Sequence, residues 1–451
     1  GDAAPVEGAT LSTEEGDFSQ AGEGTTTPSQ GEDLVLTVDD AGETFILDTG
    51  DDTITAEAGA LAGTTIMDQG GDDTLTATLT AAYNGAADAD TITGVEAISF
   101  DWDAFGTATI DADNIDGATI TATSSKTGFL GNLTINNAGD NNVVAAGGMD
   151  GDFVVTGVTT GEVDAGEAET VDVTAAGTAD DDDVLALVAG ANTTEITVAD
   201  FDSGTIDAGT ADTLDLTDDD AGDDDGDTLT VTIGADVDVT NNVDDLTIEA
   251  TAADLTVTID AVDESLVFAG SENVTLAVAD AFNLNAEVVT NSSTGTLDFV
   301  ATADVSDNTD FTDVEADTFT FESTVGEALT FNSDADVTLE VDGGAATSFV
   351  VGSGDSDILN LSIESDQASL DSDADTTNIM VAADAVADAA DITITALIGG
   401  EDYVFGATTN DFDVDGVVAA AVDASAVTGD FDLDQGAAAA LDVTGSATAD
   451  N

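Results

Sequence analysis

The chain has 451 residues with 97 acidic side chains and a single basic one, Lys126, so its formal net charge is −96. It contains no His and no Cys, which excludes Ser–His and Cys–His nucleophilic catalysis and the usual ligands of transition metals. Without a basic patch to release counterions we expect no nucleic-acid partner. With few aromatic side chains to bind sugars we expect no glycosidase-type enzyme either.

High charge is also typical of disordered chains, but short runs of alternating apolar residues and Thr, such as 255–259, predict half-buried strands instead. A folded chain must then neutralise its carboxylates. Two charges about 5 Å apart repel by roughly 0.8 kcal/mol even in water, and many such pairs outweigh a stability of about 5–15 kcal/mol. The composition therefore predicts bound divalent cations or a high-salt environment.

Location and membrane contacts are predicted from the same features. No run of 18 or more apolar residues appears, so we expect no membrane insertion. The chain begins at Gly1 without Met or an apolar leader, so we expect a processed segment whose export signal is not visible. Extreme acidity without cysteine favours an extracellular protein at a bacterial cell surface.

Residues 1–32 are rich in Gly, Glu, Ser and Thr, and they contain both prolines of the chain. Two interpretations stay open. The segment is either a flexible leader or an arm that docks on a neighbouring copy during assembly. Its apolar anchors are Val6, Leu11 and Phe18.

A repeated turn organises the region that follows. Residues 50–54 read Gly-Asp-Asp-Thr-Ile, and residues 71–75 read Gly-Asp-Asp-Thr-Leu, 21 residues later. Glycine permits the turn, and the carboxylates at the mouth of the next strand are oxygen ligands of the kind that calcium prefers. This pattern of acid before strand selects ten candidate calcium ligands: Asp51, Asp52, Asp72, Asp73, Asp90, Asp212, Asp225, Asp227, Asp355 and Asp357.

Residues 42–54 and 68–75, with the Gly-Val-Glu-Ala-Ile phrase at 94–98, resemble the calcium-binding repeats of RTX-like and S-layer-type secreted surface proteins of Gram-negative bacteria. The phrase at 422–429 is similar to one found in such surface-layer proteins. The resemblance is closest over residues 33–100, and only the second half of the nonapeptide Gly-Gly-x-Gly-x-Asp-x-apolar-x is present. It implies a cell-surface β-solenoid with several calcium ions.

Residues 100–245 contain further short strands and two acidic runs, 180–183 and 218–225. Each run precedes a predicted strand, so each is either a solvated loop or a further calcium site. Between 244 and 290, strands are predicted to begin near residues 245, 254, 265, 273 and 282. This spacing fits the coils of an elongated parallel β-helix or β-solenoid with short rungs. Tandem β-sandwich domains are the alternative.

Beyond residue 290 the phenylalanine content rises, which predicts a domain change near 290–310. The expected domains are the leader at 1–32, a repeat β-solenoid with acidic turns at 33–300, and a continuing β-rich region at 301–451. Within the last of these, residues 355–361 predict another acidic turn and strand, the Ala-rich segment 381–397 predicts one short helix, and residues 441–443 predict a final strand.

These features predict a structural subunit of an extracellular, calcium-dependent assembly, such as an S-layer, a sheath or a filament. Its partners would be further copies of the same chain and, through calcium, a cell-surface polysaccharide. The alternative is the calcium-binding region of a secreted adhesin that engages a receptor or glycan.

Overall fold

The structure is a computed structural model. It describes residues 10–11, 31, 33–84, 91–124, 131–176, 183–217, 227–262, 264–278, 288–303, 309–311 and 313–321, and beyond these the strands β32–β43 with a few residues beside the last of them. The chain divides into two compact units, Gly1–Ala235 and Asp236–Asn451.

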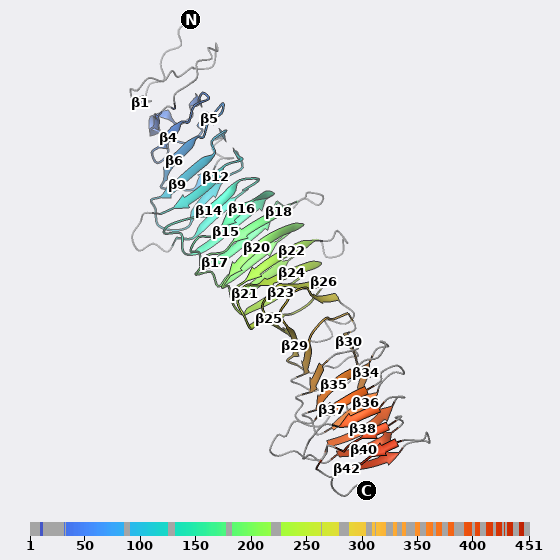
Figure 1. Cartoon of the computed structure of the whole chain (residues 1–451). Coiled ribbons are helices and arrows are strands. Elements are labelled where there is room, and N and C mark those ends of the chain that lie inside the picture. Colours follow the sequence, from blue (N-terminus) through green and yellow to red (C-terminus); the bar gives the residue numbers. More distant parts are fainter. Residues whose placement is uncertain are drawn as a thin grey trace. The chain divides into compact units, whose positions relative to one another are not determined.

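From β2 onward the strands of unit 1 stack in parallel, one coil of chain above the next (Figure 1). The longest row of unit 1, row A, begins at β2, whose other side pairs with the short antiparallel strand β1 (Thr10–Leu11). Its members are β2 (Asp33–Leu36), β4 (Thr53–Ala56), β6 (Thr74–Leu79), β9 (Ala97–Trp102), β12 (Thr119–Thr123), β14 (Asn142–Ala145), β16 (Thr160–Asp164), β18 (Val184–Val188), β20 (Ser203–Gly209) and β22 (Thr228–Ile233).

Two further rows complete the coils of unit 1. Row B contains β3 (Thr44–Ile46), β5 (Thr65–Met67), β8 (Thr91–Thr93) and β11 (Ile115–Asp116). Row C contains β7 (Tyr83–Asn84), β10 (Ala108–Asp111), β13 (Leu133–Asn136), β15 (Asp152–Val158), β17 (Thr170–Ala175), β19 (Glu195–Ala199) and β21 (Thr213–Thr217). A 3-10 turn, η1 (Val38–Asp40), joins β2 to β3.

The register of row A explains why this sequence coils. Leu34 pairs with Ile54 and Ile54 with Leu75, so the first coils are 20 and 21 residues long. These side chains point inward and are at most 2% exposed, while the Thr residues next to Ile54 and Leu75 in the same strands point outward. Burying a large aliphatic side chain stabilises the fold by about 1.5–3 kcal/mol. Stacked apolar columns therefore hold each coil to the next.

Unit 2 also consists of parallel rows. Row D contains β24 (Asp245–Ala250), β26 (Ser265–Gly270) and β28 (Val288–Asn291). Row E contains β23 (Val237–Asn241), β25 (Leu255–Ile259), β27 (Val274–Val278), β29 (Leu297–Ala301), β31 (Thr318–Phe321), β33 (Asp336–Leu339), β35 (Ile358–Ile363), β37 (Asn378–Ala382), β39 (Asp402–Phe405), β41 (Ala421–Asp423) and β43 (Asp442–Thr444). Row F contains β30 (Thr309–Phe311), β32 (Ala328–Phe331), β34 (Ser348–Val351), β36 (Gln367–Asp371), β38 (Ile392–Ile398), β40 (Phe412–Val417) and β42 (Phe431–Gln435).

Aromatic packing distinguishes the core of unit 2. Phe299 lies 5.3 Å from Phe311 and 5.6 Å from Phe319, measured between ring centroids, and both rings are tilted against it. Phe299 and Phe319 are paired residues of neighbouring strands in row E. The rise in phenylalanine beyond residue 290 thus supplies stacked core side chains.

The predicted parallel β-solenoid is confirmed, and the β-sandwich alternative is wrong because neighbouring strands within each row are parallel. Of the segment 381–397, in which a short helix is predicted, Val381 and Ala382 lie in β37 and residues 392–397 lie in β38, where both ends pair with neighbouring coils. Residues 383–391 lie outside the described residues, so a short helix there stays a prediction. The predicted domain boundaries stay predictions. Among the described residues, no helix has the length and apolarity needed to cross a membrane.

Candidate metal centre

Two acidic turns lie one above the other at the entry to row A. Asp52 precedes β4 and Asp73 precedes β6, and the pairing of Thr53 with Thr74 places the two aspartates in neighbouring coils. A Cβ on Gly71 would lie 2.2 Å from the carbonyl oxygen of Gly50. Only glycine allows the two turns to approach this closely.

A third carboxylate joins them from the opposite side of the same corner. Asp68 directly follows β5, and its Oδ2 accepts a hydrogen bond from the backbone N–H of Gly70. The next coil packs against Asp68 through Gly94, where a Cβ would lie 2.9 Å from the carbonyl oxygen of Asp68. One carboxylate oxygen from each of Asp52, Asp68 and Asp73 lies within 4.8 Å of the others.

Burial makes this group of carboxylates costly. Asp52 is 2% exposed and Asp73 is 0% exposed. Among the residues that the structure describes, no donor reaches Oδ1 of Asp68 or Oδ2 of Asp73, although both atoms are buried. Burial is the main cause that raises the pKa of Asp73 to about 7; the side-chain hydrogen bond and charge of Asp68 and the charge of Asp52 act in the same direction, and the backbone N–H of Asp52 acts against them. A buried carboxylate in this state requires a proton or a cation.

The donor set suits a hard cation. Calcium binds six to eight oxygens and accepts carboxylates in one- or two-oxygen modes. Three carboxylates with two buried oxygens that accept no hydrogen bond fit such an ion. The only base in the chain, Lys126, lies outside the described residues, so the described part of the chain contains no ammonium or guanidinium to balance the cluster.

Carboxylates near the strand entries also accept hydrogen bonds from backbone N–H groups of the neighbouring coil. The N–H of Asp52 donates to Oδ1 of Asp73 at 2.6 Å, and the N–H of Asp73 donates to Oε2 of Glu96 at 2.8 Å. The same contact recurs where the N–H of Asp183 donates to Oδ2 of Asp202 at 2.6 Å. These bonds to a charged acceptor join successive coils.

One coil uses an amide at this position. Asn141 is 1% exposed, and its Oδ1 accepts the N–H of Ala118 at 2.8 Å. Its Nδ2 donates to the carbonyl oxygens of Ile115 at 3.0 Å and Ala138 at 2.7 Å. An aspartate has no N–H to donate to these two carbonyls.

The other predicted ligands are spread along the coils. Asp51 and Asp72 are exposed, and the N–H of Asp72 donates to Oδ1 of Asp51 at 3.1 Å. Asp212 is exposed before β21, and Asp227 is half-buried before β22. Asp90, Asp225, Asp355 and Asp357 lie outside the described residues, as do residues 180–182 and 218–225 of the acidic runs. The structure thus joins Asp52 and Asp73 with Asp68. Sequence reasoning missed Asp68. The feature that could have identified it is its position directly after a strand and five residues before Asp73.

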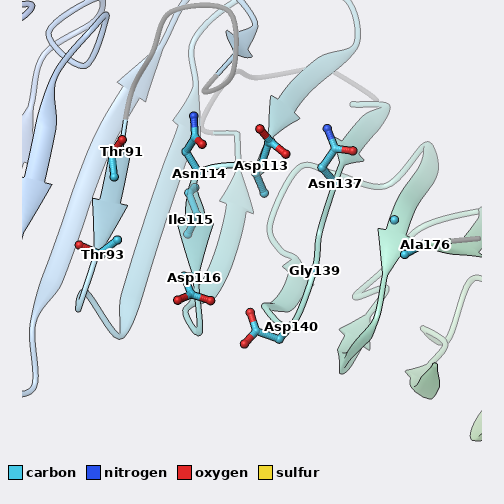
Figure 2. Close-up of a pocket in the computed structure, with 12 residues that line it drawn as sticks. Thr91, Thr93, Asp113, Asn114, Ile115, Asp116, Asn137, Gly139, Asp140 and Ala176 are labelled. Atoms are coloured by element: carbon cyan, nitrogen blue, oxygen red, sulfur yellow. The ribbon is translucent and has the colours of Figure 1, made fainter. Parts of the chain in front are cut away.

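A groove lies where row B ends. Its volume is about 510 Å³, and it is lined by Thr91, Thr93, Ala112, Asp113, Asn114, Ile115, Asp116, Asn137, Gly139, Asp140, Gly157 and Ala176. Figure 2 shows Asp116 and Asp140 at one end, and Asn114, Asp113 and Asn137 at the other. The N–H of Gly117 donates to Oδ1 of Asp140 at 3.2 Å. Carboxylate, amide and hydroxyl groups there can bind a hydroxyl-rich ligand.

Comparisons of the chain with protein-family models, with curated proteins and with solved structures found no match. The resemblance to RTX-like and S-layer-type proteins therefore stays a prediction from the turn motifs.

Proposed function

We propose that this protein is a structural subunit of an extracellular, calcium-dependent assembly on a bacterial surface, of the S-layer, sheath or filament kind. The observation that carries the proposal is the buried cluster of Asp52, Asp68 and Asp73, which brings together carboxylates of two successive coils. A calcium ion at this cluster would join the coils through its ligands.

The fold and the charge support the same function. Each coil buries a narrow apolar column and presents a polar outer face, an arrangement suited to a long, repetitive scaffold. A net charge of −96 makes like copies repel one another at low salt. Calcium bridges between carboxylates of two copies would remove this repulsion, and they would also connect the scaffold to an acidic polysaccharide.

Electron microscopy of the purified chain at low salt tests this function. With millimolar calcium we expect ordered sheets or filaments, and with chelator we expect separate particles. Magnesium serves as the matched control, because it demands octahedral geometry and loses its water reluctantly. Separate particles under all three conditions would contradict the proposal.

The adhesin alternative has one observation in its favour, the polar groove at the end of row B. A glycan array probed with the full chain tests it. Binding that is lost in Asp116→Ala and Asp140→Ala variants would favour an adhesin, and no binding to any glycan would remove that support.

A further inference from the structure

The first coil of unit 1 carries an additional strand that is not part of the solenoid. β1 (Thr10–Leu11) lies antiparallel to β2, with Thr10 opposite Val35 and Leu11 opposite Leu34. The next strand of row A, β4, pairs with the other side of β2 in parallel. β1 therefore covers the edge at which row A begins.

An uncovered edge strand presents free N–H and C=O groups to any other extended chain. The edge of β2 reads Leu-Val-Leu at residues 34–36, without charge. The leader around β1 is also uncharged, from Gly8 to Thr13, between Glu7 and Glu14. Backbone pairing of these two stretches needs no charge complementarity, which matters in a chain whose copies repel one another.

The connection between the two strands is much longer than their pairing requires. Residues 12–32 separate β1 from β2, which is 21 residues, whereas hairpins are closed by about two to five. A segment of this length reaches up to about 70 Å when extended. Closing so long a loop also costs more conformational entropy than a tight turn does. A connection of this length therefore favours pairing within one chain less strongly than a tight turn would.

From these observations we infer that the edge of β2 is an acceptor for the leader strand of a second copy of this chain. The contacts of the exchanged strand are the same within one chain and between two chains, as in domain swapping. Exchange between copies then prevails once their local concentration exceeds the effective concentration of the tethered strand, which is in the millimolar range for flexible linkers. Packed subunits of the proposed assembly would meet this condition. The inference that the exchanged strand is an assembly contact therefore rests on the proposed function.

Because the chain contains no cysteine, engineered cysteines report this pairing directly. Thr10→Cys and Val35→Cys are introduced into separate full-length chains, which are mixed, oxidised and separated without reductant. Directly opposed residues of an antiparallel pair have Cα atoms about 4.5–5.5 Å apart, within the range of about 4.4–6.8 Å that a disulfide spans. We expect a mixed dimer joined at these two positions, with a yield that rises several-fold from about 10 µM to about 1 mM protein.

The matched control mixes the Thr10→Cys chain with a Thr55→Cys chain. Thr55 pairs with Val35 but lies on β4, which has partners on both sides, so an added strand does not reach it. A mixed dimer no more abundant than in this control would overturn the inference, even if a double Thr10→Cys/Val35→Cys chain closes within itself. Calcium-dependent arrays without a mixed dimer would leave the structural function standing. A mixed dimer without arrays would contradict the function alone.

Discussion

At the scale of single residues, the chain uses similar acids for two purposes. Asp73 is buried, receives one backbone N–H and faces two other carboxylates. Asp72, its neighbour in the same turn, is exposed and lacks this environment. Both residues belong to one Gly-Asp-Asp motif in the sequence, so only their burial distinguishes the candidate ligand Asp73 from the solvated turn residue Asp72.

Removing a negative charge from the cluster should therefore weaken calcium binding, whereas removing one from the exposed Asp72 should not. Asp52→Asn, Asp68→Asn and Asp73→Asn keep the side-chain shape but remove one negative charge each. We expect each to weaken calcium binding by at least about tenfold, since even outer-shell substitutions commonly cost 10–100-fold. Calorimetric titration measures this, with Asp72→Asn as the control that should bind like the parent. Equal affinity in all four variants would assign the cluster to structure rather than to calcium.

The raised pKa of Asp73 predicts a specific pH dependence. Its pKa is near the usual 3.8 in the unfolded chain and about 7 in the folded one. The folded state thus holds this proton more tightly, and without calcium the associated stability is complete below about pH 4 and is lost as the pH rises through 7. Urea unfolding in chelator should show that the free energy of unfolding of the parent falls between about pH 4 and 7. The Asp73→Asn variant should show a smaller fall. The same dependence of the free energy of unfolding on pH in the two proteins would contradict the raised pKa of Asp73.

At the scale of elements, the alternation of apolar residues and Thr made the strands predictable. Strand starts predicted near 245, 254, 265 and 273 agree within one residue with β24–β27. The alternation did not predict which row each strand joins, nor that row B ends at β11, because those depend on corner geometry. At both ends of the Ala-rich segment 381–397, pairing with neighbouring coils places the chain in β37 and β38 in spite of the helix propensity of alanine.

Corner contacts between coils should matter to stability, most clearly at Asn141. Asn141→Ala leaves the N–H of Ala118 and two carbonyls without this partner, and an unsatisfied buried polar group costs about 1–3 kcal/mol. Asn141→Asp should also destabilise, because a carboxylate faces two carbonyl oxygens. Thermal or urea unfolding measures both. Asn142→Ala is the control, because its exposed Oδ1 accepts from the N–H of Glu162 where water can replace it. An Asn141→Asp protein as stable as the parent would contradict the geometry.

At the scale of the whole molecule, the proposed assembly depends on the leader and on the net charge. Deletion of residues 1–31 removes β1 but no strand of rows A, B or C. We expect the shortened chain to fold and bind calcium like the parent, yet to form no ordered arrays in electron micrographs. Normal arrays from this chain would show that the leader has no part in assembly.

The most direct test of the calcium account is the thermal unfolding of the full chain at low salt, followed by circular dichroism. The parent and the triple Asp52→Asn/Asp68→Asn/Asp73→Asn variant are each melted in calcium, in magnesium and in chelator. We predict that calcium raises the Tm of the parent well above its values in magnesium and in chelator, and that most of this difference disappears in the triple variant. A parent Tm that is the same in calcium and in chelator would contradict the account.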